Sequence, residues 1–149
     1  MKFKGILLDL DNTLYDYNDA HDFALIKIIN YMKNNFNIEP PTFNKAFNKS
    51  RLDVKSTLQN TASSHNRLLY FQIMLEELNI NPLIHALDIY ELYWRSFFSK
   101  MKLSEGVVEL LKKYRNKICL LTDLTAHIQY RKINRLNINK YICFIVTSE

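Results

Sequence analysis

The sequence predicts an α/β protein, in which a partial Rossmann-like parallel sheet of about three strands carries an inserted, all-helical cap. Three short apolar runs, at residues 5–8, 117–121 and 141–146, each lead into polar or charged residues. Runs of this length and composition fit strands that are covered on both faces. Helical periodicity dominates the long stretch between the first two runs, and this alternation of strands and helices is typical of a parallel sheet.

The first run ends in two carboxylates, Asp9 and Asp11, which stand two residues apart. Residues i and i+2 of an extended segment point the same way, so we expect these side chains to point alike. Asn12 and Thr13 then supply turn chemistry, and the bend can direct a carboxylate toward a ligand beyond the end of the strand. One carboxylate could stay ionised while the other handles a proton. The alternative is a polar strand end that only solubilises a loop.

The helical stretch predicts a two-part organisation, with a core at residues 1–15 and 101–149 and a cap at residues 16–100. Asp19 is a candidate N-cap of the first helix, whose apolar positions recur every three to four residues. Pro40-Pro41 is expected to end that helix, because proline cannot continue it.

Three motifs, in order along the chain, resemble those of the haloacid dehalogenase-like (HAD) superfamily of phosphohydrolases. The string Asp9-Leu10-Asp11-Asn12-Thr13 resembles the first HAD motif, and the run at residues 117–123 resembles the second. Residues 141–149 resemble the third core strand of these enzymes and the loop after it. The chain is similar to HAD enzymes whose helical cap follows the first motif.

The resemblance implies that Asp9 is the nucleophile and that Asp11 is the general acid/base. Thr122 would bind the phosphoryl group, together with the main-chain amides of Leu10 and Asp123. Mg²⁺ is the implied cofactor, bound by the Asp9 carboxylate and the Asp11 main-chain carbonyl. The implied function is removal of phosphate from a small phosphorylated metabolite, such as a sugar phosphate, through an aspartyl-phosphate. The presence of Asp11 favours a phosphatase over a dehalogenase, since HAD dehalogenases lack a second Asp at this position.

The sequence departs from the HAD pattern after its third strand, because it contains neither the Lys of the third motif nor the acidic pair of the fourth. We interpret Lys132 and Lys140 as solvated lysines and do not give them the third-motif role. The first strand is expected to lie at an edge of the sheet, open to self-association or to a complementary chain. The alternative function is therefore a noncatalytic HAD fragment that binds a phospho-ligand or a partner chain.

Within the predicted cap, residues 65–71 resemble a segment of bacterial HAD hydrolases similar to the N-acylneuraminate-9-phosphatase type. Arg67 is a candidate substrate contact, because its planar guanidinium can bind an anionic group through several hydrogen bonds. His65 is a candidate to assist Arg67 in this substrate contact. The alternative pairs Arg67 with Glu76 or Glu77 and leaves His65 on the surface.

Composition is typical of a folded domain, with 48% hydrophobic and 23% charged residues. No apolar stretch is long enough for a signal peptide or a membrane span, so we expect a cytoplasmic protein without membrane contact. The lysines and arginines behind the net charge of +5 are scattered, so no nucleic-acid partner is expected. Cys119 and Cys143 lack CxxC spacing and are interpreted as reduced thiols in interior strands.

Overall fold

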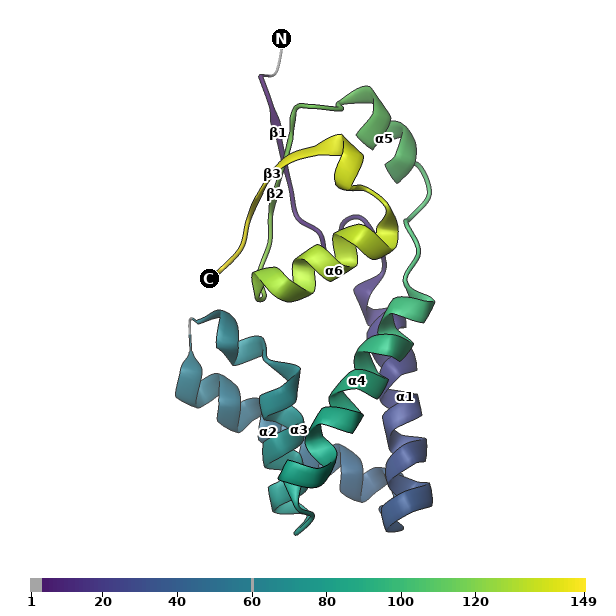
Figure 1. Cartoon of the computed structure of the whole chain (residues 1–149), viewed down its shortest axis with the longest axis vertical. Coiled ribbons are helices and arrows are strands. Elements are labelled where there is room, and N and C mark those ends of the chain that lie inside the picture. The colour runs from purple at the N-terminus through teal and green to yellow at the C-terminus, as the bar shows by residue number, and fades with distance from the viewer. Residues whose placement is uncertain (1–3, 60) are drawn as a thin grey trace.

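The structure is a computed structural model that describes residues 4–59 and 61–149, and it has the predicted α/β class (Figure 1). Three strands and their connecting helices account for most of the chain. In the described ranges, every helix is too short or too polar to cross a membrane. The elements in chain order are β1 (Ile6–Leu8), α1 (Tyr17–Phe36), α2 (Pro40–Leu58), η1 (Ala62–His65), α3 (Arg67–Glu77), α4 (Pro82–Lys100), α5 (Val107–Lys113), β2 (Ile118–Leu121), α6 (Ala126–Leu136), η2 (Asn139–Tyr141) and β3 (Ile142–Val146).

The three strands form one parallel sheet in the order β1-β2-β3. Helices connect both pairs of strands, because parallel neighbours need a crossover. β1 therefore lies at an edge of the sheet, as the sequence predicts. The carboxyl ends of β1 and β2 lie side by side, since Leu8 pairs with Leu120. This register brings the residues that follow the two strands to the same edge of the sheet.

The two faces of the sheet differ in their burial. Ile118 and Leu120 point into the core, on the side where Figure 1 shows α5 and α6. On the other face, Leu7 is 69% exposed and Phe144 is 72% exposed. The prediction that the strands are covered on both faces is therefore wrong for the described residues, because the connecting helices lie on one side only.

The interpretation of both cysteines as interior thiols is wrong for Cys143. Cys143 is exposed on the edge strand β3, at the irregularity in its pairing with β2, where Phe144 and not Cys143 lies opposite Cys119. Cys119 on the central strand is half-buried. Neither forms a disulfide.

Helices α1 to α4 form a separate layer below the sheet in Figure 1 and pack around aromatic side chains. The ring centroids of Tyr93 and Trp94 lie 5.1 Å apart, and those of Trp94 and Phe97 lie 5.2 Å apart. Edge-to-face pairs of this kind stabilise a core beyond their buried area. These side chains belong to one apolar core that continues to the buried strand residues Ile118 and Leu120, and the core and cap boundaries at residues 16 and 100 stay predictions.

The ends of the first two helices differ from the sequence prediction. Asp16 caps α1, and its carboxylate accepts a hydrogen bond from the backbone N–H of Asp19 at 2.9 Å. Asn37 ends α1 in the left-handed conformation, with a φ of 55°. Pro40 and Pro41 then begin α2 instead of ending α1. Proline suits the first helical turn because its missing N–H would have no partner there.

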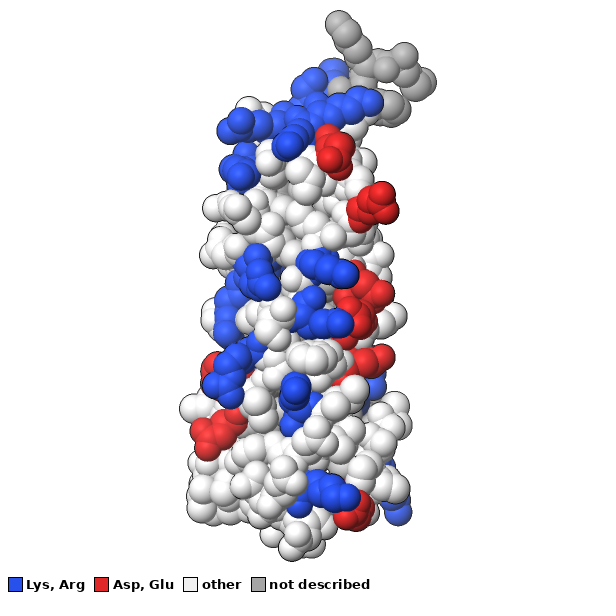
Figure 2. All heavy atoms as spheres, turned by 90° about the vertical axis from the view of Figure 1, so that its right-hand side faces the viewer, with Lys and Arg blue, Asp and Glu red and all other residues white. Residues whose placement is uncertain are grey.

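Charged side chains are mixed along the molecule. Figure 2 shows Lys and Arg spread over the length of one face, with Asp and Glu beside them. This arrangement is typical of a solvated surface and differs from the continuous basic stripe of a nucleic-acid-binding protein. The absence of a nucleic-acid partner remains a prediction.

Candidate active site

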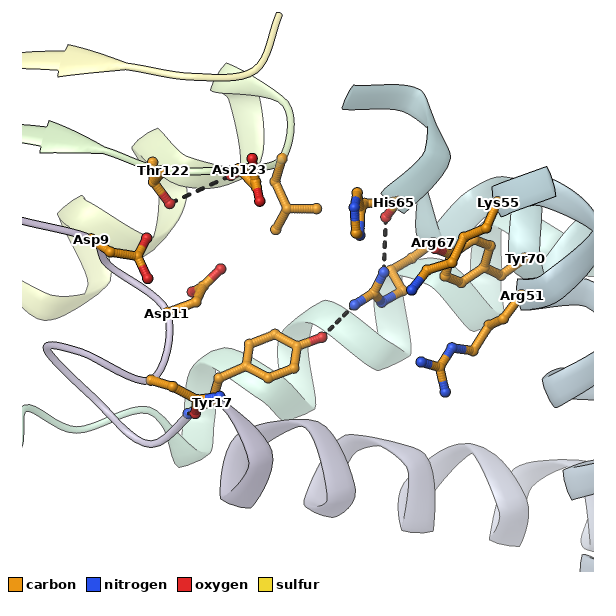
Figure 3. Close-up of a pocket in the computed structure, with 12 residues that line it drawn as sticks. Asp9, Asp11, Tyr17, Arg51, Lys55, His65, Arg67, Tyr70, Thr122 and Asp123 are labelled. Carbon is orange, nitrogen blue, oxygen red and sulfur yellow. Dashed lines mark hydrogen bonds between the residues drawn. The ribbon is translucent and has the colours of Figure 1, made fainter. Parts of the chain in front are cut away.

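The loop after β1 presents two carboxylates to a pocket. Leu10 is fully buried and anchors the loop, because its carbonyl accepts hydrogen bonds from the next turn. Asn12 adopts the left-handed conformation, with a φ of 57°, and its side chain accepts a hydrogen bond from the backbone N–H of Tyr17. The Asp9 and Asp11 carboxylates, on either side of Leu10, line one pocket (Figure 3).

Asp11 is held by two buried donors. The Lys132 ammonium donates to both carboxylate oxygens of Asp11, at 2.8 Å and 2.7 Å, and the Tyr15 hydroxyl donates to one of them. Lys132 is completely buried on α6, and this burial lowers its pKa to about 8, against the opposing effect of the Asp11 charge. A salt bridge in this setting fixes the orientation of the Asp11 carboxylate.

The interpretation of Lys132 as a solvated lysine is therefore wrong. Its face of α6 packs toward the loop after β1, and Asp11 supplies the charge that a buried ammonium needs. Lys140, which received the same interpretation, is exposed as expected.

Thr122 follows β2 and lies buried at the edge of the same pocket. Its hydroxyl oxygen accepts a hydrogen bond from the Gln129 side chain at 2.7 Å, and the same amide donates to the main-chain carbonyl of Asp123. The Thr122 hydroxyl itself donates only a long, 3.5 Å hydrogen bond to the main-chain carbonyl of Asp123 (Figure 3), so an anion in the pocket can compete for this proton. Gln129 thus orients Thr122.

The sequence analysis did not identify Gln129 as a site residue, although its position on the apolar face of a helix indicated a buried partner. Gln129 and Lys132 both occupy the inward face of α6, between the buried Ile128 and Ile133. Two polar residues three positions apart on the apolar face of an amphipathic helix need partners inside the fold. Placing α6 on a helical wheel would have identified both as candidates.

The pocket has a volume of about 270 Å³ and two walls of different origin (Figure 3). One wall comes from the loops after β1 and β2, and we call it the core wall. The other, which we call the cap wall, comes from α2, α3 and the turn between them. The core wall holds Asp9, Asp11, Asn12, Thr122, Asp123 and Leu124, and the cap wall holds Arg51, Lys55, His65, Arg67 and Tyr70, with Tyr17 beside them.

The structure therefore brings together Asp9, Asp11, Thr122, Asp123 and Arg67. Leu10 is buried behind the pocket, so only its main chain could face a ligand. Sequence reasoning missed Arg51 and Lys55 entirely. Their spacing of four residues on one helix was the available signal, because such residues share a helix face.

Arg67 is buried and held by neutral partners. Its guanidinium donates to the carbonyl of His65 at 2.8 Å and to the hydroxyl of Tyr17. The alternative pairing with Glu76 or Glu77 is wrong, since these carboxylates bind Gln72 and Lys49 respectively.

His65 lines the pocket and is half-buried, so the surface alternative for it is wrong as well. Burial and the nearby Lys55 and Arg67 cations lower the pKa of His65. The imidazole is therefore neutral at pH 7 and able to accept or donate a hydrogen bond.

The core wall offers oxygen donors that fit a hard cation. The Asp9 carboxylate is exposed and, among the described residues, accepts only a long, 3.5 Å hydrogen bond from Thr13. The Asp123 carboxylate lines the same pocket. Within the described residues no group of three or more His, Cys, Asp or Glu side chains forms a closed metal cage. Mg²⁺ commonly binds through one or two carboxylates with waters and substrate phosphates, and this donor set fits that pattern.

Comparison with known sequences places these residues in a wider context. Residues 6–149 match the family model described as haloacid dehalogenase-like hydrolase. The chain is also 33% identical over 152 residues to the ribulose-1,5-bisphosphate 5-phosphatase of Halopiger xanaduensis. That alignment covers 97% of this chain and 63% of the relative.

Solved structures share the fold. The HAD-hydrolase YfnB from Bacillus subtilis, bound to magnesium, has a TM-score of 0.64 at 16% identity, over 99% of this chain and 64% of that one. A haloacid dehalogenase-like hydrolase from Xanthomonas campestris has a TM-score of 0.61 at 18% identity, over 96% and 60%. The chain thus spans less than two thirds of the length of each of these proteins.

Proposed function

Because the chain belongs to the haloacid dehalogenase-like hydrolase family, we propose that it is a Mg²⁺-dependent phosphatase acting on a small phosphorylated metabolite. One observation carries the proposal: the free Asp9 carboxylate shares a pocket with the held Asp11 carboxylate and the oriented Thr122 hydroxyl. The relative from Halopiger xanaduensis is named for a sugar bisphosphate, which favours a sugar phosphate as the substrate.

In the proposed first step, an Asp9 oxygen attacks the phosphorus atom and the bond from phosphorus to the ester oxygen breaks. Asp11 gives a proton to the departing oxygen, so that the alcohol leaves neutral, and this proton comes from the Lys132–Asp11 pair, in which burial lowers the pKa of Lys132 to about 8. The product on the protein is an aspartyl-phosphate at Asp9. Thr122 and the main-chain N–H groups of Leu10 and Asp123 are suited to donate to the phosphoryl oxygens.

In the proposed second step, water attacks the aspartyl-phosphate and Asp11, now ionised, takes the proton from that water. The bond between Asp9 and phosphorus breaks, which releases phosphate and restores the carboxylate. Lys132 and Tyr15 hold the Asp11 carboxylate in place for both proton transfers. Mg²⁺, bound by the Asp9 carboxylate and the Asp11 main-chain carbonyl, would neutralise phosphoryl charge.

The direct test is hydrolysis of p-nitrophenyl phosphate by the 149-residue chain in the presence of Mg²⁺. Asp9→Asn should lower the rate by roughly a thousandfold or more, because it removes the nucleophile. Asp22→Asn is the matched control, since Asp22 is an exposed carboxylate outside the pocket. EDTA should abolish the activity and added Mg²⁺ should restore it. Equal rates for the parent chain and Asp9→Asn would rule out the proposed mechanism.

We also propose that the chain acts in the cytoplasm. Its two cysteines are free, as is usual in a reducing compartment. Cell fractionation with a tagged copy would test this location.

The sheet supports a second candidate function, a noncatalytic chain that associates with a second copy of itself or with a complementary partner. Leu7 and Phe144 are more than two thirds exposed on one face of the sheet, and β1 is an edge strand. Apolar patches and open edges of this kind favour association. Sedimentation velocity should detect self-association that Phe144→Asp weakens, and a parent chain that sediments as a monomer at all concentrations would contradict it.

A further inference from the structure

We propose that the cap wall binds a second anionic group of the substrate, a phosphate or a carboxylate separate from the phosphate that Asp9 attacks. The inference rests on the proposed function, whose substrate class it narrows. The substrate would be a small molecule with an anionic group at each end, seated between the two walls.

The buried Arg67 guanidinium is the first support. Its side chain is only 8% exposed, yet none of the ion pairs in the described part of the chain involves it. Its Nε atom is buried and has no hydrogen-bond partner among the described residues. A buried cation normally has a carboxylate or another anion beside it, because burial of an unpaired charge is costly. The missing counter-charge fits an anionic ligand.

Aromatic neighbours hold Arg67 in place. Its guanidinium carbon lies 5.1 Å from the ring centre of Tyr70 and 5.9 Å from that of Tyr93, and the Tyr17 hydroxyl accepts one of its hydrogen bonds. The hydrogen bonds that Arg67 donates to the His65 carbonyl and the Tyr17 hydroxyl use two of its five N–H groups. The guanidinium is therefore preorganised, with donors left for a ligand.

Two further cations extend this site along α2. Arg51 and Lys55 are four residues apart, so they share one face of the helix, and Figure 3 shows their charged ends directed toward the pocket. The ion pairs of the described residues include neither of them. The Arg51 guanidinium lies 5.9 Å from the ring centre of Phe47, which restricts its position.

The core wall does not supply ion-pair partners for Arg67, Arg51 or Lys55 among the described residues. No ion pair joins the two walls within the described ranges, and Asp11 is already paired with Lys132. The phosphate that Asp9 attacks lies on the core wall, beside Thr122, so a cap-wall anion is a different group. The cavity of about 270 Å³ is near the lower end for small-molecule sites, which limits the ligand to a short carbon chain.

Binding measurements on the full 149-residue chain carrying Asp9→Asn test this inference without turnover. Isothermal titration calorimetry with Mg²⁺ would compare a ketopentose bisphosphate, the matching ketopentose monophosphate and 3-phosphoglycerate. We expect a ligand with two anionic groups to bind at least about tenfold more tightly than the monophosphate, since each charge-assisted hydrogen bond is worth roughly a factor of ten. Whichever doubly anionic ligand binds more tightly identifies the second group as phosphate or carboxylate.

Variants in the same background locate the second group. Arg51→Gln and Lys55→Gln should each weaken the doubly anionic ligand by about tenfold and change the monophosphate by less than about twofold. Arg51→Lys should recover part of the lost affinity, because lysine keeps the positive charge but lacks the planar set of N–H donors that arginine has. Lys45→Gln is the matched control, an exposed lysine of α2 outside the pocket. Circular dichroism would show that each variant is folded.

Three outcomes would overturn the inference. They are no binding of any ligand, equal affinity for ligands with one and with two anionic groups, or a loss of affinity in Lys45→Gln as large as that in Arg51→Gln and Lys55→Gln. Hydrolysis of p-nitrophenyl phosphate combined with any of these results would leave the proposed phosphatase intact and remove only the second anion site. Conversely, a charge-dependent preference in a chain without hydrolysis would retain the site and reject the proposed phosphatase.

Discussion

A buried cation lies behind the core wall and another lies in the cap wall, and the two cations differ in their partners. Lys132, behind the core wall, binds both carboxylate oxygens of Asp11. Arg67, in the cap wall, has the neutral oxygens of Tyr17 and His65 as its hydrogen-bond acceptors. Lys132 is therefore compensated within the protein, whereas Arg67 lacks a counter-charge among the described residues.

In the proposed mechanism, Lys132 positions the acid/base Asp11, whereas Arg67 is proposed to bind the ligand. Removing a compensated buried cation leaves its partner charge buried and alone, which destabilises the folded chain. Removing an uncompensated one relieves a desolvation cost and should show its effect on ligand binding instead. Stability and binding should thus respond in opposite ways at the two walls.

Lys132→Met should have the largest effect on stability. It leaves the Asp11 carboxylate without the hydrogen bonds that the Lys132 nitrogen donates, which even a neutral amine would supply, and we expect a loss of about 3 kcal/mol in the free energy of unfolding, near the lower end for a buried pair because Asp11 is partly exposed. Urea denaturation measures the loss. Lys140→Met, at an exposed position, is the control and should change stability by less than about 0.5 kcal/mol.

A double variant checks the cause of that loss. Adding Asp11→Asn to Lys132→Met removes the unpaired charge, so part of the lost stability should return. An additive loss in the double variant would contradict the pairing.

The titration of Lys132 gives the next largest effect. Its folded pKa of about 8 lies below its ordinary value of 10.5, so between these values the unfolded chain holds more protons and stability rises with pH. The contribution is at most about 1.4 kcal/mol per pH unit. The useful window runs from about pH 8 to about pH 10, because burial raises the pKa of Tyr15 above its ordinary value of 10.0 and opposes the gain at higher pH.

Unfolding curves of the parent chain and Lys132→Met across this window isolate the lysine. The parent should gain stability with pH relative to the variant, which cannot titrate at this position. Parallel pH dependences in the two proteins would show that the folded chain does not depress the pKa of Lys132.

Local patterns in the sequence predicted the fold well. The apolar runs located all three strands, and the polar residues after them located one wall of the pocket. The pattern could not reveal that one sheet face is open, because an apolar side chain looks the same whether or not a neighbour covers it. For the same reason, Cys143 seemed buried.

Long-range pairing explains what the sequence did not predict at the site. Lys132 and Asp11 are 121 residues apart, so the pattern of α6 can show that Lys132 faces inward but not which carboxylate it pairs with. Arg51 and Lys55 likewise look like an ordinary polar helix face until α2 is placed across the pocket from Asp9. The carboxylates and the hydroxyl of the core wall belong to short local motifs, whereas their partners on α6 and the cations of the cap wall depend on how the helices pack.

Gln129→Leu should have a smaller effect, confined to the core wall. It removes the donor to Thr122, and we expect a drop of about five- to tenfold in kcat/KM for p-nitrophenyl phosphate, equivalent to roughly 1 kcal/mol. In a Thr122→Val background the same change should have no further effect, because the hydroxyl that it orients is gone. Independent, multiplicative losses would show that Gln129 acts on something other than Thr122.

Arg67→Met should have the smallest effect on stability. The lost hydrogen bonds to Tyr17 and His65 are offset by relief of an uncompensated buried charge, so we expect the free energy of unfolding to change by less than about 1 kcal/mol. The stabilisation that a doubly anionic ligand gives to the parent chain should disappear in the variant, since that stabilisation depends on affinity for the folded state. Thermal unfolding with and without a ketopentose bisphosphate measures both quantities. A loss of stability as large as that of Lys132→Met would mean that Arg67 holds the cap together, and the contrast between the two buried cations would fail.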